Sequence, residues 1–233
     1  MQIAGVTNRL SSNQKRFFAE LIGTFVVVVF ATGSVVLDAK YVGTFGLWFV
    51  ALAPTVAVAL MVYAFSKISM SHFNPAVTIG FLITRHAPRN LLPLYLSAEI
   101  IGAVLASLFV KFSIGTEANL GVNVPNYSFS IPVIFGVEVL ATAFLMGTIL
   151  IVVHYKGLRG FGGLVIGSVI GLDIFFLSFI SGASMNPVRS LAPAIFSGRI
   201  SDLWLYWSAT FVGSSIIAVI YRKLKDRSLS KVT

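Results

Sequence analysis

The chain has 233 residues and a formal net charge of +9, and 57% of its residues are hydrophobic whereas only 11% are charged. Because a soluble domain carries charge on about a quarter of its residues, a water-soluble fold could not cover this much apolar surface, and we expect an integral membrane protein. Cysteine is absent and there are three histidines, which excludes disulfides and thiolate metal sites, so we expect neither a metal nor a cofactor.

Six apolar runs are long enough to be membrane spans, since about 20 helical residues cross the hydrocarbon core. In chain order they cover residues 17–37, 44–66, 91–112, 131–154, 162–180 and 203–221. The first run lacks the pattern of a cleavable signal peptide, so we expect a spanning helix there. Two further stretches, 72–84 and 184–197, are shorter, and about 11 helical residues reach only half of the membrane. The pattern predicts an all-α integral membrane fold with six transmembrane helices and two re-entrant half-helices.

Basic residues are distributed unevenly about these spans. On one side would lie Arg9, Lys15, Arg16, Lys67, Arg85, Arg89, Lys156, Arg159, Arg222, Lys223, Lys225, Arg227 and Lys231. The other side would hold only Lys40, Lys111, Arg189 and Arg199. The richer side is predicted to be cytoplasmic and to contain both termini, as an even number of crossings requires. The charge therefore indicates a multi-pass protein of the cell membrane in contact with lipid headgroups, not a protein that binds nucleic acid.

The two short stretches begin alike, with Ser-His-Phe-Asn-Pro-Ala-Val at 71–77 and Ala-Ser-Met-Asn-Pro-Val-Arg at 183–189. The first and fourth spans are also related, through Ala-Glu-Leu-Ile-Gly-Thr at 19–24 and Val-Glu-Val-Leu-Ala-Thr at 137–142. Three spans in each half invert the second half relative to the first. We therefore predict a single channel domain over 1–233, built from inverted repeats at about 1–112 and 131–233 with a linking loop at 113–130.

Each short stretch contains an Asn-Pro pair, Asn74-Pro75 and Asn186-Pro187, that predicts the start of a helix. Asparagine is a favoured helix N-cap, and proline suits the first helical position because its missing N–H would be unpaired there. Two half-helices that enter from opposite faces would direct their positive dipole ends at one another and repel cations and protons. The asparagine amides could meanwhile donate hydrogen bonds to a neutral solute.

These motifs resemble the aquaporin, or major intrinsic protein, family over nearly the whole chain. The paired Asn-Pro-Ala boxes of that family match Asn74-Pro75-Ala76 fully and Asn186-Pro187-Val188 with valine for alanine. Arg189 and Ser190 follow the second box as in the family, and Glu20 and Glu138 match its span glutamates. The resemblance implies an hourglass monomer with its own pore, assembled as a homotetramer, that acts as a channel and not as an enzyme.

Four polar residues are expected to support the pore. Arg189 matches the selectivity arginine of the family, although an arginine near the mouth could also snorkel to headgroups. Glu20 and Glu138 could relay protons, but we favour buried acceptors for the unpaired N–H groups of the half-helix loops. His72 matches the histidine of the inner vestibule, and we favour a fixed hydrogen-bonding role over a pH sensor.

The selectivity filter of the family has four positions, which the resemblance assigns to Ile174, Ala183, Arg189 and Pro54. Ile174 stands where strict water channels have histidine, and Pro54 stands where the family usually has an aromatic residue. A proline should kink the second span, so the register could shift to another residue. The alternatives are Trp48, Phe49 and Ala57.

Two other features of the fifth span are interpreted as packing. Gly163, Gly167 and Gly171 recur every four residues, a spacing that lets two helices cross closely. Asp173 precedes Ile174 and should point away from the pore, so packing or an interface is favoured over solute contact.

A filter without histidine and with a small alanine is similar to those of glycerol facilitators and plant nodulin-like channels. We therefore expect passive diffusion of water and small uncharged solutes, with glycerol-like polyols first and urea, ammonia or metalloid hydroxides as alternatives. Bulky neighbours could instead refill the space and leave a water-selective pore. Rival classes are a coupled secondary transporter and a non-conducting membrane scaffold, which a proteoliposome swelling assay would distinguish.

Overall fold

The computed structural model describes residues 10–158 and 160–229, so that three basic residues of the charge prediction, Arg9, Arg159 and Lys231, lie outside the described residues. Six long helices have the length and apolar composition of membrane spans, which confirms the six-span prediction. They are α1 (Ser12–Lys40), α2 (Gly46–Ser69), α4 (Leu92–Phe109), α6 (Ile131–His154), α7 (Gly162–Ser181) and α9 (Leu203–Leu229). A 3₁₀ turn at Arg89–Leu91 precedes α4, and a π-turn at Val110–Ile114 extends it.

Two short helices correspond to the predicted half-helices, α3 (Pro75–Ile83) and α8 (Pro187–Ser197). Both begin later than the stretches predicted from the apolar pattern, at the proline of each Asn-Pro pair. The residues before each asparagine are not helical, because Met70, Ser71 and Phe73 in one loop have positive φ angles. Gly182, Ala183 and Met185 have positive φ angles in the other loop. An apolar pattern cannot distinguish such a buried non-helical segment from a helix.

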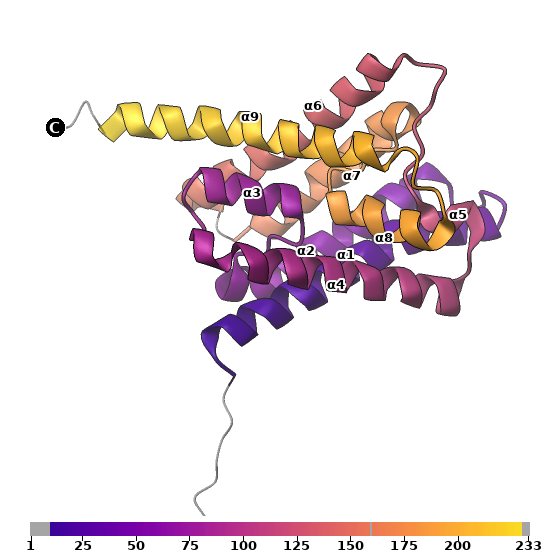
Figure 1. Ribbon diagram of the computed structural model, residues 1–233, viewed down its shortest axis with the longest axis horizontal. Helices are drawn as coiled ribbons and strands as arrows, with labels where there is room; N and C mark the ends of the chain where they lie inside the picture. Colours follow the sequence, from indigo (N-terminus) through magenta and orange to yellow (C-terminus); the bar gives the residue numbers. More distant parts are fainter. Residues whose placement is uncertain (1–9, 159, 230–233) are drawn as a thin grey trace, which may run out of the picture.

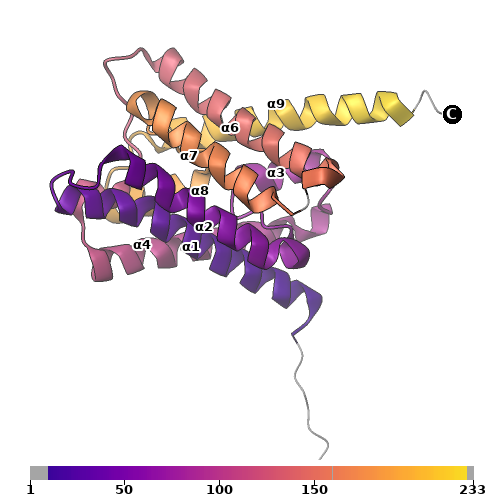
Figure 2. The ribbon, with the colours of Figure 1, turned by 180° about the vertical axis from the view of Figure 1, so that it is seen from behind.

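The helices of the two halves pack in equivalent ways. In the first half α1 packs against α2 and α4, and in the second half α6 packs against α7 and α9. The half-helices cross between the halves, since α3 packs mainly on α9 and α8 mainly on α4. Figure 1 shows α3 and α8 between α4 and α9, with α3 nearer the end of the bundle from which the C-terminus leaves. Seen from behind in Figure 2, α2 and α7 lie side by side and join the halves.

Small residues allow the closest of these crossings. A Cβ atom on Gly167 of α7 would lie 2.4 Å from the carbonyl oxygen of Thr55, and one on Gly163 would lie 2.6 Å from that of Ala59. The interpretation of the glycine stripe as packing is therefore confirmed. Gly102 and Gly213 serve the α1–α4 and α6–α9 crossings in the same way, with Cβ positions 2.5 and 2.3 Å from backbone carbonyl oxygens.

Candidate functional site

The starts of α3 and α8 meet inside the bundle and are joined by the two predicted asparagines. Asn74 caps α3 by accepting a hydrogen bond from the Ala76 N–H at 2.9 Å, and Asn186 caps α8 through the Val188 N–H at 3.1 Å. The Asn74 amide also donates to the carbonyl oxygen of Met185 at 2.8 Å. The Asn186 amide donates to that of Phe73 at 2.9 Å. Each amide has two N–H groups, so one holds the opposite loop and the second is left for a solute.

Glu20 and Glu138 hold the two loops from behind, in equivalent positions. The carboxylate of Glu20 accepts hydrogen bonds from the backbone N–H groups of His72 and Phe73 at 3.0 and 2.7 Å. Glu138 accepts from those of Ser184 and Met185 at 2.8 and 3.2 Å. Both glutamates are fully buried, and each satisfies two N–H groups that a helix would otherwise have paired.

His72 belongs to a buried polar cluster with Thr78 and Glu99. The Thr78 hydroxyl donates to Glu99 at 2.6 Å and lies 2.8 Å from Nδ1 of His72. Because a hydroxyl has one hydrogen, Thr78 accepts from the Nδ1–H of His72, and the imidazole ring stacks on Tyr95 with 4.2 Å between the ring centroids. His72 is therefore fixed in place. In the second loop a pair of serines, Ser184 and Ser190, occupies the corresponding position.

A row of backbone carbonyl groups remains available on the same two loops. Within the described part of the chain, the carbonyl oxygens of Met70, Ser71 and His72 accept no hydrogen bond, and neither do those of Ala183 and Ser184. All five residues line one cavity. Unpaired carbonyl groups are tolerated at membrane depth only where they face water or a solute, so they indicate a hydrated path.

The cavity lined by these carbonyl groups, which we call the inner cavity, has a volume of about 130 Å³. A water molecule needs roughly 10–15 Å³ measured in this way, so there is room for several. Opposite the carbonyl groups, its wall is apolar and is formed by residues of α1, α2, α6 and α7. Those residues include Val27, Val58, Val62, Leu145, Ile149, Ile166 and Ile170. The carbonyl groups on one side would replace part of the hydration of a solute, and the apolar wall on the other side would leave the solute free to move.

Arg189 lies at the outer end of the inner cavity, 9% exposed, and its guanidinium is held by three hydrogen bonds to two segments of the chain. Its Nη1 donates to the carbonyl oxygen of Gly121 at 2.8 Å and to Oδ1 of Asn123 at 2.6 Å. Its Nη2 donates to the carbonyl oxygen of Ala31 at 3.2 Å. These three bonds leave two of the five guanidinium N–H groups for a solute. The arginine is therefore buried in the bundle and does not snorkel to the headgroups.

Asn123 is a site residue that the sequence did not reveal. Its Oδ1 accepts from both Arg189 and Ser190, and its amide donates to the carbonyl oxygen of Gly182 at 2.7 Å. It follows α5 (Glu117–Gly121), a turn in which Ala118, Asn119 and Leu120 have left-handed backbone angles. The sequence indicated only a loop that links the two halves, so only its place in the fold shows that it reaches the arginine.

A second, outer cavity shares Ala31, Ile174, Ala183 and Arg189 with the inner one, so these four residues lie at their junction. Three of the four predicted filter residues are thus brought together. Pro54 lines the inner cavity only, and one turn earlier Val50 lines the outer cavity.

The helix α2 continues through Pro54 without a shift in register, since Pro54, Val58, Val62 and Ser66 all line the inner cavity at intervals of four residues. The three alternatives to Pro54 therefore do not take its place. Trp48 is 60% exposed, Ala57 is fully buried, and Phe49 packs on Phe45.

Asp173 is buried next to Ile174 but lines neither cavity. Its Oδ2 has no hydrogen-bond partner among the described residues. Its position agrees with packing more than with solute contact, but no contact in the structure explains the unpaired oxygen. Within the same part of the chain, no group of three or more His, Cys, Asp or Glu side chains is arranged to hold a metal ion.

Comparisons with known proteins agree with this geometry. Residues 7–221 match the model of the family described as major intrinsic protein. Aquaporin NIP3-1 of Arabidopsis thaliana is 34% identical, covering 93% of this chain and 69% of that protein. Nodulin-26 of Glycine max is 32% identical, covering 94% and 82%. The X-ray structure of the aquaglyceroporin from Plasmodium falciparum superposes with a TM-score of 0.72 at 24% identity, covering 94% of this chain and 98% of that one, and shows the same fold.

Proposed function

This chain belongs to the major intrinsic protein family of membrane channels, and we propose that it passes glycerol-sized polyols in addition to water. Channels of this family are not enzymes, and their solutes are water and small neutral molecules. The finer question is therefore the size and chemistry of the solute that the junction between the two cavities admits.

The composition of that junction is the observation that carries the proposal. Arg189 supplies the only charge, while Ala31 and Ala183 are small and Ile174 is apolar. A polyol has hydroxyl groups along one edge and C–H groups along the other. Its hydroxyl groups would accept from the free N–H groups of Arg189, and its carbon chain would lie against Ile174. A histidine in place of Ile174 would narrow the passage and bind water instead.

Pro54 supports the same reading by adding an acceptor. Proline has no N–H, so the carbonyl oxygen of Val50, one turn earlier, loses its helical donor, and the proline ring displaces that carbonyl. Val50 lines the outer cavity and Pro54 the inner one, so this oxygen belongs to the face of α2 at the junction. A solute could then donate to Val50 while accepting from Arg189, which suits a hydroxyl group and gives no advantage to an apolar solute.

Ion exclusion follows from the charges around the path. The N-termini of α3 and α8 both direct positive dipole ends at the meeting point of the asparagines, and Arg189 adds a full positive charge further out. No Asp or Glu of the described chain lines either cavity, so a cation would find no counter-charge to replace its water. The absence of a carboxylate cluster there also disfavours a coupled transporter.

The proposal is tested in proteoliposomes by light scattering after an osmotic step. In sucrose the vesicles should only shrink, whereas in glycerol they should shrink and then re-swell faster than protein-free vesicles. Shrinkage without faster re-swelling would mean a water-selective pore and would reject the polyol. Flux that depends on an ion gradient would mean a transporter, and no flux of water or glycerol would mean a scaffold.

Three further properties belong to this proposal. The chain is a multi-pass membrane protein, and the excess of basic residues on one face supports cytoplasmic termini and a place in the plasma membrane. The equivalent packing of the halves supports one channel domain made of two inverted repeats. The family resemblance supports a homotetramer with one pore in each subunit, which native mass spectrometry of the purified protein would test.

A further inference from the structure

A hollow with three arginines lies apart from the pore, at the end of the bundle where α3 ends, α4 begins and α9 leaves. Its wall includes Arg85, His86, Arg89 and Arg222 together with the apolar residues Leu82 and Ile83. We call it the basic hollow. The positive-inside rule places this end of the bundle at the cytoplasmic leaflet.

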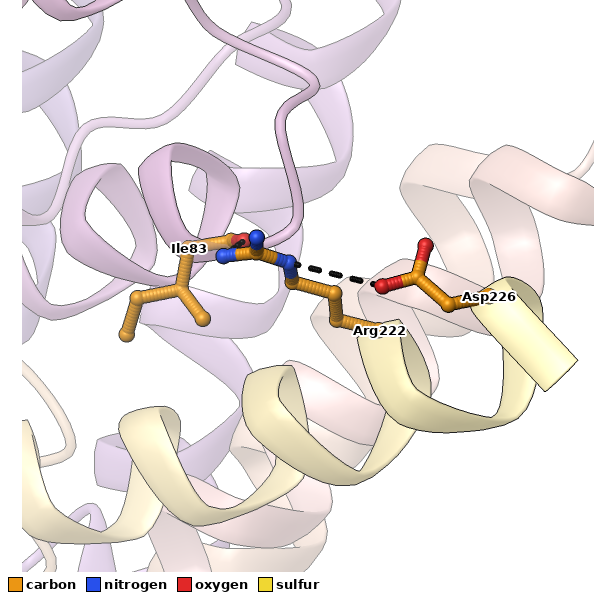
Figure 3. A network of polar contacts seen from close by, with 3 residues as sticks. All are labelled: Ile83, Arg222 and Asp226. Carbon is orange, nitrogen blue, oxygen red and sulfur yellow. Dashed lines mark hydrogen bonds and ion pairs between the residues drawn. The ribbon is translucent and has the colours of Figure 1, made fainter.

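One of the three arginines is held by protein groups. Figure 3 shows Arg222 of α9 between the end of α3 and Asp226. Its Nη1 donates to the carbonyl oxygen of Ile83 at 3.5 Å, and its Nε lies 3.8 Å from a carboxylate oxygen of Asp226. These contacts are long and partly exposed, so they orient the guanidinium without saturating its five donors.

The other two arginines have no such partner. Arg85 and Arg89 are exposed, and neither side chain makes a hydrogen bond or ion pair to the described residues. Among the described residues, Asp226 is the only carboxylate in an ion pair with a guanidinium of the hollow, so the charges of Arg85 and Arg89 are left without compensation. His86 also lines the hollow, and its pKa is lowered by burial first and then by the charge of Lys225.

Uncompensated guanidiniums around one hollow favour an anion with several oxygens, because each planar fork can donate two parallel hydrogen bonds to a phosphate. The apolar side of the hollow indicates where that phosphate comes from. Leu82 and Ile83 form part of its wall, and Val219, Ile220 and Leu224 of α9 expose apolar surface at the same end of the bundle. An inorganic ion would not use this apolar surface, but the acyl chains of a lipid would cover it.

We propose that the basic hollow is a binding site for the headgroup phosphate of an anionic phospholipid of the cytoplasmic leaflet. Basic pockets between membrane helices on this side are suited to such headgroups. The site does not depend on which solute the pore conducts, because it shares no side chain with the junction around Arg189.

The test uses the purified full-length chain in detergent, with dioleoylphosphatidic acid titrated in and the bound fraction measured by native mass spectrometry. Dioleoylphosphatidylcholine, with the same acyl chains and no net charge, is the lipid control. The variant Arg85→Gln with Arg89→Gln should bind phosphatidic acid roughly 30-fold more weakly, from about 1 kcal/mol for each basic residue near the headgroup. The matched control is Lys15→Gln with Lys223→Gln, which removes two exposed charges outside the hollow and should leave the dissociation constant nearly unchanged.

Three results would overturn the proposal. Equal losses in the two double variants would mean diffuse attraction by the basic face. Unchanged binding in the arginine variant would mean that lipid binds elsewhere. Displacement of phosphatidic acid by millimolar inorganic phosphate would mean that the hollow takes a soluble phosphate. Water permeability retained by the arginine variant would show that its fold is intact, so that its loss of lipid binding can be assigned to the hollow.

Discussion

Pro54 provides the sharpest prediction, because its proposed effect on the filter depends on the backbone N–H that proline lacks. Replacement by alanine or by valine restores a backbone N–H at position 54, which can donate to the carbonyl oxygen of Val50. The two variants share this change but differ in size, since alanine is smaller than proline and valine is larger. A comparison of the two therefore separates the loss of an acceptor from a change in pore width.

The magnitudes follow from the local geometry. A proline inside a helix costs about 3 kcal/mol relative to alanine, and α2 runs through Pro54, so Pro54→Ala should raise the free energy of unfolding by about 1–3 kcal/mol. A solute hydrogen bond to the Val50 oxygen contributes about 1 kcal/mol, so losing it should reduce glycerol permeability by roughly fivefold. Water has other acceptors along its path, so its permeability should change less.

The assay is stopped-flow light scattering on proteoliposomes that contain equal amounts of each variant, with thermal unfolding measured on the same preparations. Both variants should show a lower ratio of glycerol to water permeability. A higher ratio for Pro54→Ala together with a lower one for Pro54→Val would show that width alone controls selection. An unchanged ratio in both would refute the assignment of the Val50 carbonyl to the filter.

Three other predictions concern the residues that hold the site. Glu20→Gln and Glu138→Gln should each lower the free energy of unfolding by about 1–3 kcal/mol, because each leaves one buried loop N–H without an acceptor. The measurement is thermal unfolding, and destabilisation of only one of the two variants would contradict the equivalence of the two glutamates. Asn123→Ala should weaken the hold on Arg189 and reduce selection against solutes larger than glycerol, measured as erythritol permeability, and a wild-type erythritol rate would count against it. Gly167→Ala should destabilise the protein by roughly 1–3 kcal/mol, because the new Cβ would overlap the Thr55 carbonyl oxygen. Gly136→Ala is the control and should be neutral or stabilising, because nothing lies within 4 Å of its Cβ position. Equal thermal unfolding of the two variants would show that the α2–α7 crossing can relax.

Much of the site was predictable where its causes are local. Asn-Pro pairs mark helix starts through the cap and the missing N–H, and those preferences act within a few residues of the chain. The glutamates were predictable as acceptors because a re-entrant loop leaves N–H groups that must be paired somewhere in the bundle. The starts predicted at Asn74 and Asn186 are confirmed, since these residues cap α3 and α8. The apolar pattern alone extends each stretch back to 72 and 184, because it cannot distinguish a buried loop with positive φ angles from a helix.

The amino-acid sequence by itself determined the six spans and the two half-helix starts. The spans depend on the length of the apolar runs, and the starts depend on local capping chemistry. The tertiary structure alone decided that each asparagine amide holds the opposite loop, that Asn123 reaches Arg189, and that Pro54 keeps its register beside Val50. Each of these findings depends on which segments lie within a few ångströms of one another, and that is set by how the helices pack.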